Sequence, residues 1–272
     1  MRREYRRDSF CGDGTESGKN GIDAAAEKPK LVPAIAKTSA AGMISVIQPA
    51  PRSVMNSKLK VFLSHSSKDK KLASDLKDVF ETFGIDVFVA HQDIMPSTEW
   101  QRRILQELRA CDVFLALLSK NFLNSDWTDQ ESGIALYLKK VVIPIRVSVM
   151  PYGFMATKQA HPLNAGNLSD SCTEMGKAID GEIKLRKRFR HHLIQAFVGS
   201  HNFSSSIAAA IMITELEGFT AKQVNDITKA AYENDQIYGC KAMGYITGFI
   251  ERNHRKISAE NMRRIQGEIV SS

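Results

Sequence analysis

The stretch that decides the fold is KVFLSHSSKDKKLASDLKDVFETFGIDVFVA, residues 60–90. It holds two near-continuously apolar segments, KVFLSH and IDVFVA, on either side of a segment whose apolar residues recur every three or four positions. Apolar runs without alternation are typical of parallel strands that helices cover on both faces. The recurrence between them predicts a helix that ends before Gly84. The stretch therefore predicts a β–α–β unit.

Two further apolar segments, DVFLALLS at 112–119 and VVIPIRV at 141–147, continue the pattern. Helices are predicted around 100–108 and 129–138, where apolar residues again repeat at helical spacing. Alternation of strand and helix at this spacing predicts an α/β fold with a flavodoxin-like open parallel sheet. A polar cluster follows each strand, at the edge where such sheets bind ligands.

The rest of the chain divides into a leader and a helical tail. Residues 1–57 are rich in Gly, Ser, Ala, Lys and Pro, which predicts a flexible leader. We expect the sheet domain over 58–172, its last part irregular with a short edge strand. Residues 173–272 predict a C-terminal helical bundle, packed on the sheet domain or used for self-association. A chain that ends near Phe197 is expected to keep the sheet.

The first part of this tail predicts one long basic amphipathic helix from about Glu174. Its apolar stripe repeats every four residues, and five basic residues occupy the other faces: Leu185, Phe189, Leu193 and Phe197 form the stripe, and Lys184, Arg186, Lys187, Arg188 and Arg190 are basic. Such a helix can bind a membrane, nucleic acid or an acidic partner. The alternative, which we favour, is a helix that closes the domain and exposes its basic face to solvent. Further helices are predicted at 238–252 and 258–269, and a capping box from Thr220 to Gln223 begins another.

Composition excludes several classes of protein. The 272 residues carry a formal net charge of +7, which is too small an excess to indicate nucleic-acid binding. The four cysteines are scattered without a C-x-x-C motif, which argues against a zinc site or a disulfide scaffold and suits a reducing cytoplasm. The longest apolar runs are too short to span a membrane. We expect a cytoplasmic protein with no metal and no membrane or nucleic-acid partner.

Four motifs in the predicted sheet domain carry a family resemblance: SHSSKD at 64–69, DVFVAHQDIMPSTEW at 86–100, CDVFLALLS at 111–119 and SDWTDQE at 125–131. Together, and in this order, they resemble a bacterial TIR (Toll/interleukin-1 receptor) domain over roughly residues 58–160. The resemblance implies that NAD+ is a substrate, with no cofactor, and that Glu131 matches the catalytic glutamate of the NAD-cleaving members. It also implies that residues 91–99 form the mobile loop that gates the pocket and mediates assembly.

The chemistry expected of Glu131 can also be argued from the reaction. Loss of nicotinamide from NAD+ passes through an oxocarbenium-like transition state, and the cationic leaving group needs no protonation. One carboxylate beneath the ribose could therefore suffice. Trp127 lies one helical turn before Glu131 and could form a wall of the cleft. The alternative is a packed aromatic residue beside a solvated acid.

Ser64, His65 and Ser66 end the first strand, and Phe88 lies in the second. With Trp127 they are the predicted substrate-binding residues. The alternative is a helix N-terminus that Ser66 or Ser67 caps, with Asp69 in its first turn. A nucleophilic triad of Ser64, His65 and Asp69 is not expected, because adjacent residues on a strand point to opposite faces.

The predicted assembly loop holds an apolar pair that a solvated turn does not need. Its candidate residues are His91, Ile94, Met95 and Pro96. They suit a surface that meets another copy of the chain. The alternative is that Ile94 folds back onto its own domain.

Three functions stay open. The first is an NAD+ glycohydrolase or cyclase of antiphage defence, similar to Thoeris-type TIR proteins, which forms an ADP-ribose-type and possibly cyclic signal for a separate effector. The second is a non-catalytic adaptor that acts by TIR–TIR assembly. The third is a deoxyribosyltransferase-like activity, since that chemistry also uses a glutamate at an open α/β sheet. The glutamate at position 131 favours the enzyme that cleaves NAD+.

Overall fold

A computed structural model of the protein describes residues 57–89 and 98–267. The predicted leader, apart from Ser57, lies outside the described residues. The predicted assembly residues His91, Ile94, Met95 and Pro96 lie outside them as well, so their role stays a prediction.

Five parallel strands form one sheet in the order β2-β1-β3-β4-β5. They are β1 (Lys60–Ser64), β2 (Asp86–Val89), β3 (Val113–Leu118), β4 (Val141–Arg146) and the short edge strand β5 (His161–Pro162). Every residue of β3 is buried, as expected for a strand covered on both faces. The predicted flavodoxin-like open parallel sheet is confirmed.

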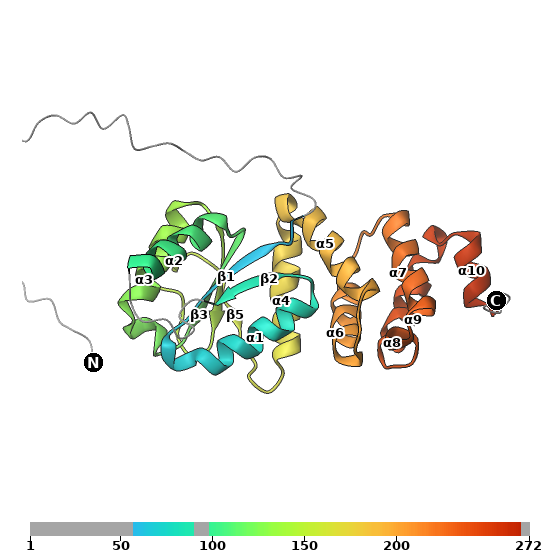
Figure 1. The fold of residues 1–272 in the computed structure, drawn as a ribbon, viewed down its shortest axis with the longest axis horizontal. Coiled ribbons are helices and arrows are strands. Elements are labelled where there is room, and N and C mark those ends of the chain that lie inside the picture. Colours follow the sequence, from blue (N-terminus) through green and yellow to red (C-terminus); the bar gives the residue numbers. More distant parts are fainter. Residues whose placement is uncertain (1–56, 90–97, 268–272) are drawn as a thin grey trace, which may run out of the picture. The chain divides into compact units, whose positions relative to one another are not determined.

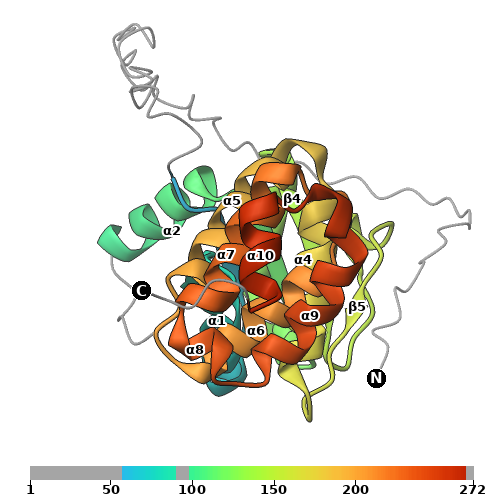
Figure 2. The ribbon, with the colours of Figure 1, turned by 90° about the vertical axis from the view of Figure 1, so that its right-hand side faces the viewer.

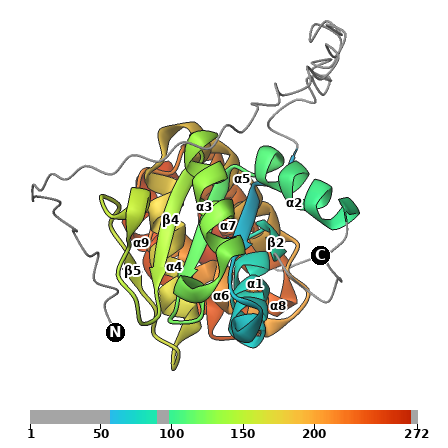
Figure 3. The ribbon, with the colours of Figure 1, turned by 90° about the vertical axis from the view of Figure 1, so that its left-hand side faces the viewer.

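Two layers of helices cover the sheet (Figure 1). On one face lie α1 (Lys70–Thr82) and α4 (Leu168–Gly181), whose apolar side chains join those of β1 and β3 in one core cluster. On the other face lie α2 (Thr98–Ala110) and α3 (Asp126–Tyr137), which pack with a second cluster around Phe62 and Phe114. Figure 3 turns α2 and α3 toward the viewer.

The regular elements in the described part of the C-terminal region are helices, which confirms the predicted bundle (Figure 2). Its helices are α5 (Ile183–Val198), α6 (Phe203–Thr214), α7 (Ala221–Glu233), α8 (Asp235–Tyr238), α9 (Ala242–Asn253) and α10 (Ala259–Ile265). The core cluster of β1 and α1 continues without interruption through α5 and α6 to Phe249 on α9. The bundle is therefore packed on the sheet domain, one of the two arrangements expected.

Two of the predicted helices are each divided in the structure. The long helix expected from Glu174 is instead α4 followed by α5, because Glu182 between them adopts extended backbone angles. Residues 238–252, expected as one helix, hold the end of α8 and most of α9, with a turn after Gly239. In both places a glycine, Gly181 or Gly239, stands at the break, and glycine weakens a helix interior. The domain boundary predicted at 172 falls inside α4.

Helix α5 closes the sheet domain, and its predicted apolar stripe is buried. The sequence alone suggested that the basic face of this helix is exposed to solvent. Two of its basic residues are instead held in ion pairs. Arg190 is 8% exposed and donates two hydrogen bonds of 2.7 Å to the carboxylate of Asp180. Arg188 pairs with Asp112, which lies just before β3. These ion pairs fix α5 to α4 and to the sheet.

Candidate functional site

The candidate site centres on a hydrogen bond between two residues that lie far apart in the sequence. Ser64 ends β1, and its hydroxyl donates to Oε2 of Glu131 on α3 over 2.5 Å. Ser64 is fully buried and Glu131 is 1% exposed. Because Ser64 is the last residue of β1, it stands at the carboxyl edge, where parallel sheets of this type bind ligands. In the sheet, β1 lies between β2 and β3.

Burial changes the acidity of this carboxyl group. Loss of hydration raises the pKa of Glu131 to about 8, although the hydrogen bond from Ser64 acts in the opposite direction. Without a ligand, burial therefore favours the protonated form of Glu131. A nearby positive charge would favour the carboxylate form.

The start of α3 is anchored by a side chain, which fixes the position of Glu131 one turn later. The hydroxyl of Thr128 donates to the carbonyl oxygens of Phe122, over 2.8 Å, and Ser125, over 2.7 Å. The hydroxyl of Ser132 in turn donates to the carbonyl oxygen of Thr128 over 2.7 Å. These bonds hold the first turns of α3 against the segment that follows β3.

The aromatic residues predicted to bind substrate lie in the second core cluster. Trp127 is half-buried and meets Trp100 of α2 edge-on, with ring centroids 4.6 Å apart. Phe88 is also half-buried; its ring lies 5.2 Å from that of Phe62, and the guanidinium of Arg103 lies over it at 5.9 Å. Both are packing residues in this structure, and their role toward a substrate stays a prediction.

His65 is fully buried and Ser66 is 7% exposed, so both lie within the fold at the end of β1. The alternative of a helix N-terminus is borne out in part, because Ser66 is the N-cap residue of a short 3-10 turn and Asp69 lies in its first turn, but no side chain caps it. The hydroxyl of Ser66 makes no capping hydrogen bond to the short 3-10 turn η2 (Ser67–Asp69), and Asp69 makes none to α1. The carboxylate of Asp69 is engaged elsewhere.

Asp69 belongs to a polar cluster that the sequence analysis missed. It accepts hydrogen bonds from Ser119 Oγ over 2.6 Å and from Asn121 Nδ2 over 2.8 Å. Ser119 Oγ also accepts from the backbone N–H groups of Asn121 and Phe122. The cluster joins the ends of β1 and β3 beside the candidate site. The position of Ser119 and Asn121 directly after an apolar strand was the available signal.

A second contact near α3 was also missed. The hydroxyl of Tyr152 donates to Asp129 Oδ1 over 2.6 Å. Burial raises the pKa of Tyr152, and the hydrogen bond to the Asp129 carboxylate raises it further. Asp129 and Glu131 are neighbours in the sequence, but only Glu131 is buried, because Asp129 is on the exposed side of the helix.

We also searched the part of the chain that the structure describes for a metal site and for a reactive cysteine. No group of three or more His, Cys, Asp or Glu residues there has the arrangement of a metal site. Burial raises the pKa of the Cys111 thiol to about 11 and that of Cys172 to about 12, which suppresses the nucleophilic thiolate. Within the described ranges, no helix has both the length and the apolar character needed to cross a membrane.

Comparison with known proteins finds similarity in the sheet domain. Residues 61–177 match the family described as TIR domain. A protein of Brachypodium distachyon, named "Probable 2' cyclic ADP-D-ribose synthase BdTIR", is 27% identical over 97 residues, which cover 35% of this chain and 43% of that protein. The chain thus matches less than half of that relative's length.

Among solved structures, the comparison found the TIR domain of the Toll-related Receptor TRR-2 from Hydra magnipapillata. The match has a TM-score of 0.37 and 17% sequence identity, and it covers 42% of this chain and 92% of the other.

Proposed function

We propose that residues 61–177, which match the family described as TIR domain, cleave NAD+ at the bond between nicotinamide and ribose, with Glu131 as the catalytic carboxylate. The observation that carries the proposal is the buried pair of Ser64 and Glu131 at the carboxyl edge of the sheet. The relative in Brachypodium distachyon, whose name describes an enzyme that forms a cyclic ADP-ribose, supports the same chemistry.

The proposed reaction needs the ionised form of Glu131. NAD+ brings a positive charge on its pyridinium ring, and an opposite charge close to a buried carboxyl group lowers its pKa. Substrate binding would therefore favour release of the Glu131 proton to water, which leaves the carboxylate. The resulting carboxylate can accept hydrogen bonds from ribose hydroxyls and stabilise the positive charge that develops as the N-glycosidic bond breaks.

Ser64 positions this carboxylate. Its hydroxyl donates to one oxygen of Glu131, Oε2, which fixes the plane of the group without neutralising its charge. A carboxylate held in this way needs little reorganisation during the reaction, which is the source of electrostatic catalysis. Nicotinamide leaves as a neutral molecule, so no second acid is required.

The fate of the ribosyl cation separates two kinds of product. Water gives linear ADP-ribose, whereas a nucleophile within the same molecule gives a cyclic form. We propose an ADP-ribose-type signal that acts on a separate effector in bacterial antiphage defence, with assembly through TIR domains. The name of the plant relative supports the cyclic form. The resemblance to Thoeris-type proteins supports the role in defence.

One observation favours a second candidate, an adaptor that acts only by assembly. Glu131 is 1% exposed, so in this conformation its carboxyl group is closed to a ligand, and burial favours its neutral form. The enzyme requires a conformation in which Glu131 is accessible. An adaptor does not.

The test is NAD+ cleavage by the purified chain, followed as release of nicotinamide and formation of an ADP-ribose species. We expect Glu131→Gln to lower turnover by at least about a thousandfold, or ~4 kcal/mol of transition-state stabilisation. Asp126→Asn is the matched control, because Asp126 is an exposed carboxylate on the same helix. It should retain full activity.

Two results would decide against the enzyme. Full NAD+ cleavage by a folded Glu131→Gln protein would remove Glu131 from the mechanism. Absence of nicotinamide release over a wide range of protein concentrations, in a preparation that self-associates, would favour the adaptor.

A further inference from the structure

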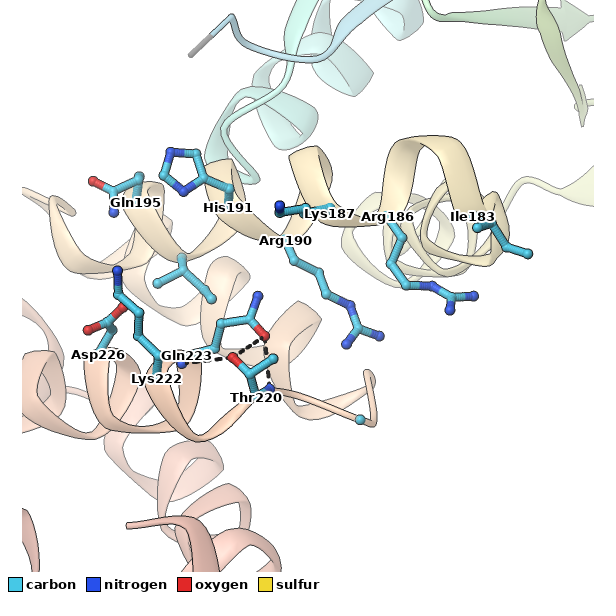
Figure 4. A pocket seen from close by; sticks show the side chains of 12 residues that line it. Ile183, Arg186, Lys187, Arg190, His191, Gln195, Thr220, Lys222, Gln223 and Asp226 are labelled. Carbon is cyan, nitrogen blue, oxygen red and sulfur yellow. Dashed lines mark hydrogen bonds between the residues drawn. The ribbon is translucent and has the colours of Figure 1, made fainter. Parts of the chain in front are cut away.

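A cavity of about 490 Å³ lies away from the Ser64–Glu131 site, between α5 and α7. Figure 4 shows side chains of the two helices on either side of it: those of α5 come from above and those of α7 from below. Six of the lining residues matter here: Ile183, Arg186, Lys187, Ile194, Lys222 and Asp226. The volume falls within the range of about 300–1,000 Å³ that is typical of small-molecule sites.

The charged groups around this cavity are mostly cationic. Arg190 is neutralised by Asp180, and the Nε of Arg186 donates to the backbone oxygen of Asp180 over 2.8 Å. Lys187 and Lys222 are exposed, and neither makes an ion pair or hydrogen bond with any residue that the structure describes. Two ammonium groups from different helices therefore face the same space unneutralised.

Unneutralised cations in a concave site favour an anionic ligand. Walls of low dielectric focus the field of the charges that line a cleft, which raises the local concentration of the opposite charge. The N-terminus of α7, at Ala221, adds the positive end of its helix dipole. Asp226 is the one carboxylate among the lining residues. A single carboxylate cannot neutralise both lysines.

An apolar surface adjoins these charges. Ile183 is 83% exposed, an unusual position for a large apolar side chain at the start of a helix. Ile194 is 3% exposed and lies farther along the same helix, at the wall of the cavity. Inorganic phosphate has no apolar surface to bury against these side chains, whereas an aromatic base has one.

We propose that this cavity binds a nucleoside diphosphate or a compound that contains one, with the diphosphate between Lys187 and Lys222 and the base against Ile183. The proposal does not depend on NAD+ cleavage at Glu131. It assigns a ligand to the C-terminal bundle, whose α5 also holds the sheet domain through the ion pair of Arg188 and Asp112.

The test is calorimetric titration of the full chain with ADP at physiological ionic strength, with inorganic pyrophosphate and adenosine as separate probes. We expect saturable binding of ADP, tighter than that of either probe alone. Lys187→Glu and Lys222→Glu should each weaken ADP binding by at least about tenfold, since each replaces one charge-assisted hydrogen bond by repulsion. Ile183→Ser should weaken binding of ADP and leave binding of pyrophosphate unchanged.

Lys184→Glu is the matched control, because Lys184 is an exposed residue of α5 outside the cavity and the charge change is the same. It should leave ADP affinity within about twofold. Equal weakening by Lys184→Glu would reveal non-specific attraction and overturn the proposal. If Lys187→Glu and Lys222→Glu leave the ADP affinity unchanged, the ligand binds elsewhere, for instance beside Glu131, and the proposal is wrong. If a single-stranded oligonucleotide binds more tightly than ADP, and this binding depends on the same two lysines, the surface binds nucleic acid and the proposal is wrong.

Discussion

At the scale of single residues, Glu131 combines two roles that conflict. Its burial in the fold favours the neutral form of the carboxyl group, whereas the proposed reaction needs the charged form. The conflict can be measured without any substrate. A buried glutamic acid whose pKa is raised binds a proton in the folded protein at a pH where the unfolded chain has lost it.

The sign of the pH dependence follows from this. The pKa of Glu131 is raised from an ordinary value of 4.5 to about 8, so its contribution to stability is complete below 4.5 and is lost as pH rises through 8. Gln stays neutral at every pH. We expect the melting temperature of Glu131→Gln, relative to wild type, to increase from pH 5 to about pH 8 and to level off above it, where the folded protein has also lost the proton.

Thermal unfolding followed by circular dichroism measures this difference, and each kcal/mol corresponds to about 2–4 °C. Asp126→Asn removes an exposed carboxylate from the same helix and should show no such increase. A constant difference between Glu131→Gln and wild type across this pH range would mean that Glu131 keeps an ordinary pKa.

At the scale of elements, the turn between α1 and β2 depends on a close approach to α5. Gly84 has a φ of +74°, and a Cβ built there would lie 2.5 Å from the backbone oxygen of His192. Both features require glycine, because an L-residue is strained at this φ and the obstructing atom belongs to a backbone. The same glycine that ends α1 thus allows α5 to dock.

We expect Gly84→Ala to destabilise the protein by at least about 2 kcal/mol, of which about 1–2 kcal/mol comes from the left-handed backbone alone. The free energy of unfolding in urea measures the change. Gly133→Ala is the matched control: Gly133 lies inside α3 with nothing within 4 Å of a new Cβ. That change should stabilise the helix by about 0.5–1 kcal/mol. A loss of only about 1 kcal/mol in Gly84→Ala would be explained by the backbone conformation alone and would show that α5 does not pack closely against this turn.

At the scale of the whole described chain, the sheet domain and the helical bundle share one core. Met212 and Ile213 of α6 are fully buried in the same cluster as Phe80 of α1 and Phe189 of α5. The sequence suggested that a chain ending near Phe197 keeps the sheet. The continuous core argues that such a chain loses a wall that the sheet domain needs.

We therefore expect a chain that ends at Val198 to be unfolded or aggregated. Each fully buried Met or Ile side chain contributes about 1.5–3 kcal/mol, and domains of this size have a total stability of about 5–15 kcal/mol. Loss of α6 removes several such side chains and exposes their partners on α5. Circular dichroism and size-exclusion chromatography of the truncated protein, compared with the full chain, measure the effect. A monomeric, cooperatively folding product would show that the bundle is separable.

The sequence alone determined the sheet, the order of its elements and the position of Glu131. The sheet was readable from local patterns: the apolar runs at 61–63 and 113–118 and the helical spacing between the strands. The order of the four motifs indicated which helix carries Glu131. The apolar stripe of α5 and the capping box at Thr220 were also readable, because each depends on residues three or four positions apart.

Only the tertiary structure decided what surrounds these residues. The bond from Ser64 to Glu131 spans 67 positions, and that from Ser119 to Asp69 spans 50, so neither leaves a periodic signal in the sequence. The pKa of Glu131 depends on how completely packing removes water from its carboxyl group. The cavity beside Lys187 and Lys222 exists because α7 lies against α5. Contacts between distant segments are set by packing of the whole core, which local sequence patterns do not encode.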